Sequence, residues 1–132
     1  MGYKVKLKCN SCDYEETFNL GHCNSDGSIE KVLPLLNDEN REYIKKIIVK
    51  DNLISFTFYR KLGYCEKCKK ISAINIINLF TKDGNVVELR DTCPICNNRV
   101  LIFDLESNID VNLTCIKCGK AKLDIKRIGS FD

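Results

Sequence analysis

Hydrophobic and polar residues alternate along four separate stretches of the chain, and a pair of cysteines interrupts each stretch. The stretches are residues 3–20, 59–76, 88–105 and 110–128. In the first, YKVKLKCNSCDYEETFNL, the alternation continues on both sides of the cysteines. A period of two is typical of β-strands that bury one face. The pattern therefore predicts a strand–turn–strand unit that is used four times, with the cysteines at the turns.

The residues between the first two units have a helical pattern instead. Apolar residues at 43, 44, 47 and 48 have the i, i+3, i+4 spacing of an amphipathic helix over 38–50, with acidic residues at its start and lysines at its end. Asn37 or Asp38 can cap this helix, and a shorter one over 29–36 begins after Ser28 and is limited by Pro34. We expect the apolar stripe to pack on the sheet; a partner-binding groove is the alternative.

Other local signals complete the predicted elements. Residues 22–28, HCNSDGS, have the composition of a loop, and the alternating residues 53–65 predict a strand that leads into the second cysteine pair. Residues 78–89 predict a hairpin that turns at Asp83-Gly84 or Gly84-Asn85. The expected fold class is a small, mainly β protein (α+β) with a short helical insert.

Eight of the nine cysteines form four C-x-x-C pairs: Cys9/Cys12, Cys65/Cys68, Cys93/Cys96 and Cys115/Cys118. Two cysteines at this spacing in a tight turn, a knuckle, can point at one ion, and two knuckles supply the four ligands of a closed zinc site. The residue after the second cysteine often takes a positive φ. Here these residues are Asp13, Lys69, Asn97 and Gly119. The pattern predicts two Zn²⁺ ions per chain.

Other cysteine chemistries fit less well. A thioredoxin-type dithiol requires a helix that starts inside the motif, and none of the four pairs begins a helical pattern. A catalytic zinc site keeps an open position and is rich in histidine, whereas the chain has one histidine. A rubredoxin-like iron site is the metal alternative. The charged opening residues lack a signal-peptide core, so we expect a cytoplasmic location, where paired thiols bind metal rather than form disulfides.

Spacing favours one division of the eight ligands. Cys96 and Cys115 have 18 residues between them, which suits a compact ribbon with a hairpin over 97–114 that turns at ESNID. The preferred sites are therefore Cys93, Cys96, Cys115 and Cys118 in one, and Cys9, Cys12, Cys65 and Cys68 in the other. The expected domains are two rubredoxin-like zinc ribbons: residues 1–88, with the helical insert at about 28–50, and residues 89–132.

Two other divisions stay open. The second in rank joins Cys65/Cys68 to Cys93/Cys96, which have 24 residues between them, and leaves Cys9/Cys12 with Cys115/Cys118. The third closes the opening stretch on itself through His22 and Cys23, and leaves six ligands for one site. In the preferred division His22 is a surface or turn residue and Cys23 is a spare thiol, and neither has an assigned role.

The charge of the chain argues against a global attraction to nucleic acid. The formal net charge is +3, but eight ligand thiolates and two Zn²⁺ ions bring the metal-loaded protein to about −1. A local basic patch is a candidate nucleic-acid surface, formed by Lys117, Lys120, Lys122, Lys126 and Arg127. The alternative is a solvated face, since aromatic residues do not interleave with these lysines as they do in a stacking platform.

The arrangement of motifs resembles a known group of proteins. MGYKVKLKCNSCDYEETFNLG, then YCEKCKK after a helical insert, then CPIC and CIKCG, resemble small bacterial tandem zinc-ribbon proteins of an uncharacterised family. The resemblance covers most of the chain, although only the knuckles and the first twenty residues are specific. It implies metal binding at the eight paired cysteines and implies no activity.

These observations predict a non-catalytic zinc-binding module that mediates interaction with a protein or a nucleic acid. A redox or metal-handling protein, with bound iron or labile zinc thiolates, is the alternative. The chain has no catalytic constellation, such as a triad, paired carboxylates or a glycine-rich phosphate loop, so we expect neither an enzyme nor a small-molecule substrate. The longest apolar run, AINIINLF, is too short to span a bilayer, so no membrane association is expected.

Overall fold

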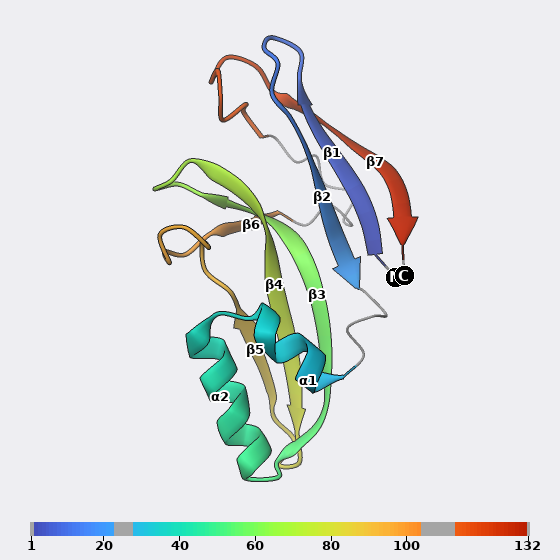
Figure 1. Ribbon diagram of the computed structural model, residues 1–132, viewed down its shortest axis with the longest axis vertical. Coiled ribbons are helices and arrows are strands. Elements are labelled where there is room, and N and C mark those ends of the chain that lie inside the picture. Colours follow the sequence, from blue (N-terminus) through green and yellow to red (C-terminus); the bar gives the residue numbers. More distant parts are fainter. Residues whose placement is uncertain (1, 23–27, 104–112, 132) are drawn as a thin grey trace.

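The computed structural model describes residues 2–22, 28–103 and 113–131. Within these ranges the strands are β1 (Gly2–Cys9), β2 (Glu15–His22), β3 (Leu53–Cys65), β4 (Lys70–Thr81), β5 (Val86–Arg90), β6 (Leu101–Phe103) and β7 (Leu123–Phe131). They form one antiparallel sheet in the order β5-β4-β3-β2-β1-β7, and β6 pairs with β3 beside this path (Figure 1). The expected mainly β class with short helices is therefore confirmed.

The two ends of the chain lie side by side in this sheet. β1 pairs with β2 on one side and with β7 on the other, so Gly2 lies opposite both Gly21 and Phe131. Figure 1 shows the resulting three-stranded layer, with blue β1 against red β7 and the two termini together. Strands from the beginning and the end of the chain thus form one terminal unit, and the central residues are inserted between them.

This arrangement differs from the expected division into residues 1–88 and 89–132. Residue 88 lies inside β5, which pairs with β4. β7 completes the sheet of β1 rather than a separate compact ribbon. The difference arises because β-pairing between distant segments costs little more loop-closure entropy than pairing between near ones.

The central unit is a long hairpin of β3 and β4 with helices on one face. The helices are α1 (Ile29–Val32), a 3₁₀ turn (Leu33–Leu35) and α2 (Asp38–Val49). Of the two predicted caps, Asn37 and Asp38, Asn37 caps α2, because its side-chain oxygen accepts from the Asn40 amide at 2.9 Å. Ile44 of α2 is fully buried with Ile77 and Leu79 of β4. The helix therefore packs on the sheet, which is the expected role of its apolar stripe.

The alternating pattern of β1 produces the predicted two faces. Val5 and Leu7 are buried, whereas Lys4 and Lys8 point to solvent. The buried face contributes to a core cluster that includes Leu62 of β3 and Leu123 of β7. This cluster packs the terminal unit against the cysteine-bearing end of the central hairpin.

Residues 97–114 were expected to form a hairpin, but their described ends pair with other segments of the chain. Leu101–Phe103 forms β6, which pairs with residues 62–64 of β3. Thr114 instead forms a bridge with Lys122 in the turn that leads to β7. The expected ESNID turn lies outside the described residues. No helix in the described ranges is long and apolar enough to cross a membrane.

Candidate metal centres

Each cysteine pair occupies a tight turn that the backbone closes. The amides of Cys93 and Cys115 donate to the carbonyls of Asn98 and Ala121 at 2.9 and 2.8 Å. The backbone then reverses at a positive φ of 54° at Lys69, 62° at Asn97 and 68° at Gly119. The left-handed turn predicted after the second cysteine is thus confirmed at three knuckles, whereas Asp13 is not among the described residues with positive φ.

Several donors point at the sulfur atoms. The Ser11 amide lies 3.4 Å from Sγ of Cys9, and the Cys68 amide lies 3.4 Å from Sγ of Cys65. The side-chain amide of Asn98 donates to Sγ of Cys96 at 3.2 Å. Such donors stabilise thiolates, which are the metal-binding form of cysteine.

The first group of sulfurs, the terminal tetrad, consists of Cys9, Cys12, Cys115 and Cys118. Cys9 ends β1, and the second knuckle comes just before β7, so the β1–β7 pairing brings the two knuckles together. Sγ of Cys9 lies 3.7 Å from that of Cys118, and Sγ of Cys12 lies 3.6 Å from that of Cys115. The tetrad thus joins the two ends of the chain.

The second group, the central tetrad, consists of Cys65, Cys68, Cys93 and Cys96. The first knuckle is the turn between β3 and β4, and the second follows β5. Sγ of Cys65 lies 3.5 Å from that of Cys96, and Sγ of Cys68 lies 3.9 Å from that of Cys93. This tetrad therefore lies at the cysteine-bearing end of the central hairpin.

The sulfur spacing fits a tetrahedral metal site and not a disulfide. In both tetrads all four sulfurs lie within 4.8 Å of one another. A Zn–S bond of about 2.3 Å in a tetrahedron requires sulfurs about 3.8 Å apart. A disulfide requires about 2.05 Å, and all eight of these cysteines are free. The residues present therefore fit two tetrathiolate metal ions.

The division of the ligands corrects the preferred prediction. Cys93/Cys96 does not join Cys115/Cys118, and Cys9/Cys12 does not join Cys65/Cys68. The structure has the arrangement that ranked second by spacing. The preference rested on the 18 residues between Cys96 and Cys115, but β6 pairs with β3 and leaves the fourth knuckle to β1.

Hydrogen bonds shift the pKa values of the central tetrad in opposite directions. The Asn98 side-chain amide lowers the pKa of the Cys96 thiol to about 6. The hydrogen bond with Cys96 raises the pKa of the Cys68 thiol to about 12. Sulfurs in contact share protons in this way, and a bound cation takes the place of those protons.

The terminal tetrad shows the same contrast. At Cys115, desolvation is outweighed by backbone hydrogen bonds from Cys118 and Lys117, and the pKa falls to about 6. At Cys12, a backbone hydrogen bond from Tyr14 is outweighed by desolvation and by hydrogen bonds with neighbouring thiols, and the pKa rises to about 12. Metal binding at either tetrad therefore releases protons and weakens as the pH falls.

The two unassigned residues are not described at side-chain level. His22 ends β2 and its backbone pairs with Tyr59 of β3. Cys23 lies outside the described residues, so its expected role as a spare thiol stays a prediction. Both tetrads are complete without either residue.

The candidate basic patch divides between two faces. Lys117 forms an ion pair with Asp13 beside the terminal tetrad. Lys122 and Lys126 are exposed on the outer face of β7 and the turn before it. Arg127 lies opposite buried Val5, and its guanidinium stacks 3.9 Å from the ring centroid of Tyr3. Arg127 therefore belongs to the inner face of the strand.

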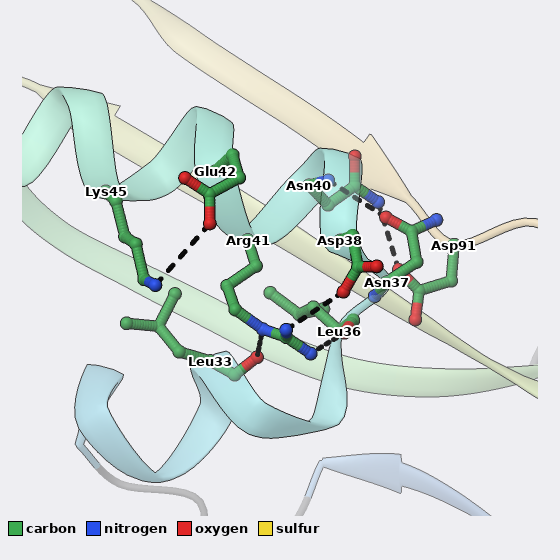
Figure 2. A network of polar contacts seen from close by, with 9 residues as sticks. All are labelled: Leu33, Leu36, Asn37, Asp38, Asn40, Arg41, Glu42, Lys45 and Asp91. Carbon is green, nitrogen blue, oxygen red and sulfur yellow. Dashed lines mark hydrogen bonds and ion pairs between the residues drawn. The ribbon is translucent and has the colours of Figure 1, made fainter.

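A polar network that the sequence pattern did not predict anchors the third knuckle, and Figure 2 shows the part of it around Asn37, Asn40 and Asp91. The Asp91 carboxylate accepts from the Asn37 amide at 3.1 Å and from the Asn40 side chain at 3.0 Å. The Asn75 side chain donates to its other oxygen at 3.1 Å. Asp91 lies two residues before Cys93, so the network connects α2 and β4 to the central tetrad. The pattern of single polar residues gave no signal for these long-range contacts.

The fold and the two tetrads define an antiparallel β protein whose cysteines are placed to bind two metal ions. No protein-family model matches the chain, and no curated protein or solved structure matches it either.

Proposed function

We propose that the chain is a non-catalytic zinc-binding module with two structural Zn²⁺ sites, which holds a surface for a protein or nucleic-acid partner. The observation that carries the proposal is the pair of tetrads, with closest sulfurs 3.5–3.9 Å apart. Each tetrad combines two knuckles, which is the ligand arrangement of a zinc ribbon. The resemblance to small bacterial zinc-ribbon proteins favours the same assignment.

Four thiolates close the coordination sphere of each ion. Four sulfurs complete a tetrahedral sphere and leave no position for a substrate, and the first cysteine of every pair is also buried. A closed tetrathiolate is the usual form of a structural zinc site. In this role the ion supplies folding free energy, of order 10 kcal/mol per site in small zinc domains.

The cleft beside the third knuckle supports the non-catalytic assignment. A cleft of about 620 Å³ lies between the start of α2 and the third knuckle, lined by Leu36, Ile74 and Ile95 among others. One of its carboxylates, Asp91, accepts three hydrogen bonds that join it to α2 and β4. These contacts hold the carboxylate to α2 and β4, so we assign Asp91 a structural role.

Metal analysis of the purified protein tests the proposal. We expect two zinc ions per chain and no visible absorption, because Zn²⁺ has a filled d shell. Two iron ions with the red colour of a ferric tetrathiolate would establish the rubredoxin-like alternative instead. The second cysteine of each pair is half-buried and so partly accessible to reagents, which favours the other alternative, a metal-handling protein with labile zinc thiolates.

A further inference from the structure

The outer face of the terminal unit gathers lysines that are scattered in the sequence. Because side chains alternate along a strand, Lys4, Lys6 and Lys8 of β1 share the face opposite to the core. Lys126 of β7 lies directly opposite Lys6, and Lys122 lies on the same side at the start of that strand. We call Lys4, Lys6, Lys8, Lys122 and Lys126 the lysine face.

The charge of this face is only partly compensated. Lys6 is paired with Glu15 at 2.5 Å, and Asp124, which lies opposite Lys8, accepts from the Asn10 side chain at 3.2 Å. Within the described residues, the other lysines of the face form no ion pair. Five lysines and two carboxylates thus leave about three positive charges on one side of three strands.

The lysine face also places two like charges side by side, which lowers the stability of the sheet. Lys6 and Lys126 lie directly opposite each other on adjacent strands. Like charges in this position destabilise a sheet, whereas opposite charges stabilise it. A carboxylate at residue 126 would complete a ladder of ion pairs, so the lysine there points to a ligand that carries negative charge.

We propose that the lysine face binds the phosphate backbone of nucleic acid without reading its sequence. Lys4 and Lys8 are four residues apart, which is about 14 Å along a strand, so the face is too long for one phosphate and suits a polyanion. On β2, Thr17 lies opposite Lys6 and Asn19 lies opposite Lys4, and both are polar. Anchoring to a membrane surface requires a set of apolar side chains beside the basic ones. The residues directly opposite Lys4, Lys6 and Lys8 are polar, charged or glycine, and exposed Ile128 lies at the irregularity in β7 without a directly paired residue in β1.

Lysine chemistry explains the expected lack of sequence preference. An ammonium is a point charge that contacts phosphate, whereas arginine reads guanine with its planar fork. Arg127, the arginine of β7, is turned to the inner face over Tyr3. Neither β2 nor β7 has an aromatic residue directly opposite Lys4, Lys6 or Lys8, so bases have no stacking platform between these lysines.

The alignment of the lysine face depends on a metal ion at the terminal tetrad, so the inference rests on the proposed function. Cys9 ends β1, and Cys118 lies five residues before Leu123, which pairs with Cys9. A metal ion at the terminal tetrad therefore fixes β7 beside β1 and aligns the lysines of both strands. The ion at the central tetrad lies outside this contact, so its loss should affect nucleic-acid binding much less.

The test is fluorescence anisotropy of the zinc-loaded protein with a short labelled oligothymidine, from about 50 to about 200 mM salt. The variant K4Q/K8Q/K126Q is compared with K31Q/K46Q/K50Q, which removes the same charge from exposed lysines of the helical region. Each lost phosphate contact lowers the salt slope by about 0.7 on a single strand. We expect the first variant to lose about 2 in slope and more than tenfold in affinity, and the control to match the wild type.

Metal content, measured in the same samples, separates two kinds of failure. A protein with two zinc ions that does not bind the oligonucleotide, or that loses equal affinity in both variants, overturns the lysine face and leaves the metal module intact. Binding to phosphatidylserine vesicles but not to oligonucleotide overturns it as well. A protein without bound metal contradicts the proposed function itself.

Discussion

The hydrogen-bond network around Asp91 allows a quantitative test of how the central tetrad is held. Asp91→Ala removes a carboxylate that accepts from the Asn37 amide, the Asn40 side chain and the Asn75 side chain, at 3.0–3.1 Å. Asn40 is 8% exposed, so its amide loses a partner that water replaces poorly.

The expected cost follows from these contacts. A hydrogen bond to a charged group contributes about 1.5–3 kcal/mol, but Asp91 is only half-buried and water compensates for part of the loss. We therefore expect Asp91→Ala to reduce the free energy of unfolding by about 2–4 kcal/mol. Because the carboxylate also precedes Cys93, the affinity of the central tetrad for metal should fall with it.

A matched control lies on α2, the helix that Asp91 contacts through Asn37 and Asn40. Asp38 also carries its carboxylate near the start of α2, but its side chain is 95% exposed and pairs with Arg41 at 3.0 Å (Figure 2). Its removal should cost only about 0.3–1 kcal/mol. Urea denaturation of the zinc-loaded proteins gives both values. Equal losses in Asp91→Ala and Asp38→Ala would refute the idea that the network anchors the third knuckle.

Three further substitutions address other parts of the account. Asn98→Ala removes the donor to Sγ of Cys96 and should weaken zinc binding at the central tetrad by about 10–100-fold. The pH at which half of the zinc is released should rise, because the Cys96 thiolate loses the hydrogen bond that lowers its pKa. Chelator competition that shows no change in affinity would contradict this expectation. Gly63→Ala should destabilise the protein by about 1–3 kcal/mol, since its Cβ would lie 2.5 Å from Cγ1 of Ile74; an unchanged melting temperature would show that the strand adapts freely. Cys23→Ser should leave two bound metal ions, and native mass spectrometry that finds one would return Cys23 to the ligand set.

The local elements were predictable because local patterns determine them. The helix over 38–50 with its Asn37 cap, the strand over 53–65 and the positive φ at Asn97 depend on residues within a few positions. The eight candidate metal ligands were predictable for the same reason, because each C-x-x-C pair closes its own turn.

The pairing of the knuckles was not predictable in this way. It depends on β7 lying against β1 and on β6 pairing with β3, and both contacts join residues far apart in the chain. The length of the connecting loop says little about which knuckles pair, since doubling that length adds only about 0.6 kcal/mol to the entropic cost of bringing its ends together. The 18-residue spacing between Cys96 and Cys115 therefore carried less information than it suggested.

The lysine face illustrates the same limit for function. Lys122 and Lys126 were recognisable as a basic stretch, but the partners in β1 and the opposite orientation of Arg127 follow from the strand register. Alternation places Lys4 and Lys8 on one side of their own strand, whereas only the sheet order shows which strand lies beside them.

Cadmium NMR can show whether two metal ions are bound and which four cysteines hold each of them. In protein loaded with ¹¹³Cd²⁺, each ion couples through its sulfur ligands to the β-protons of the cysteines that bind it. We expect two cadmium signals, one correlated with Cys9, Cys12, Cys115 and Cys118 and the other with Cys65, Cys68, Cys93 and Cys96. A signal that correlates with both Cys93 and Cys115, or with Cys23, would contradict the pairing on which the account rests.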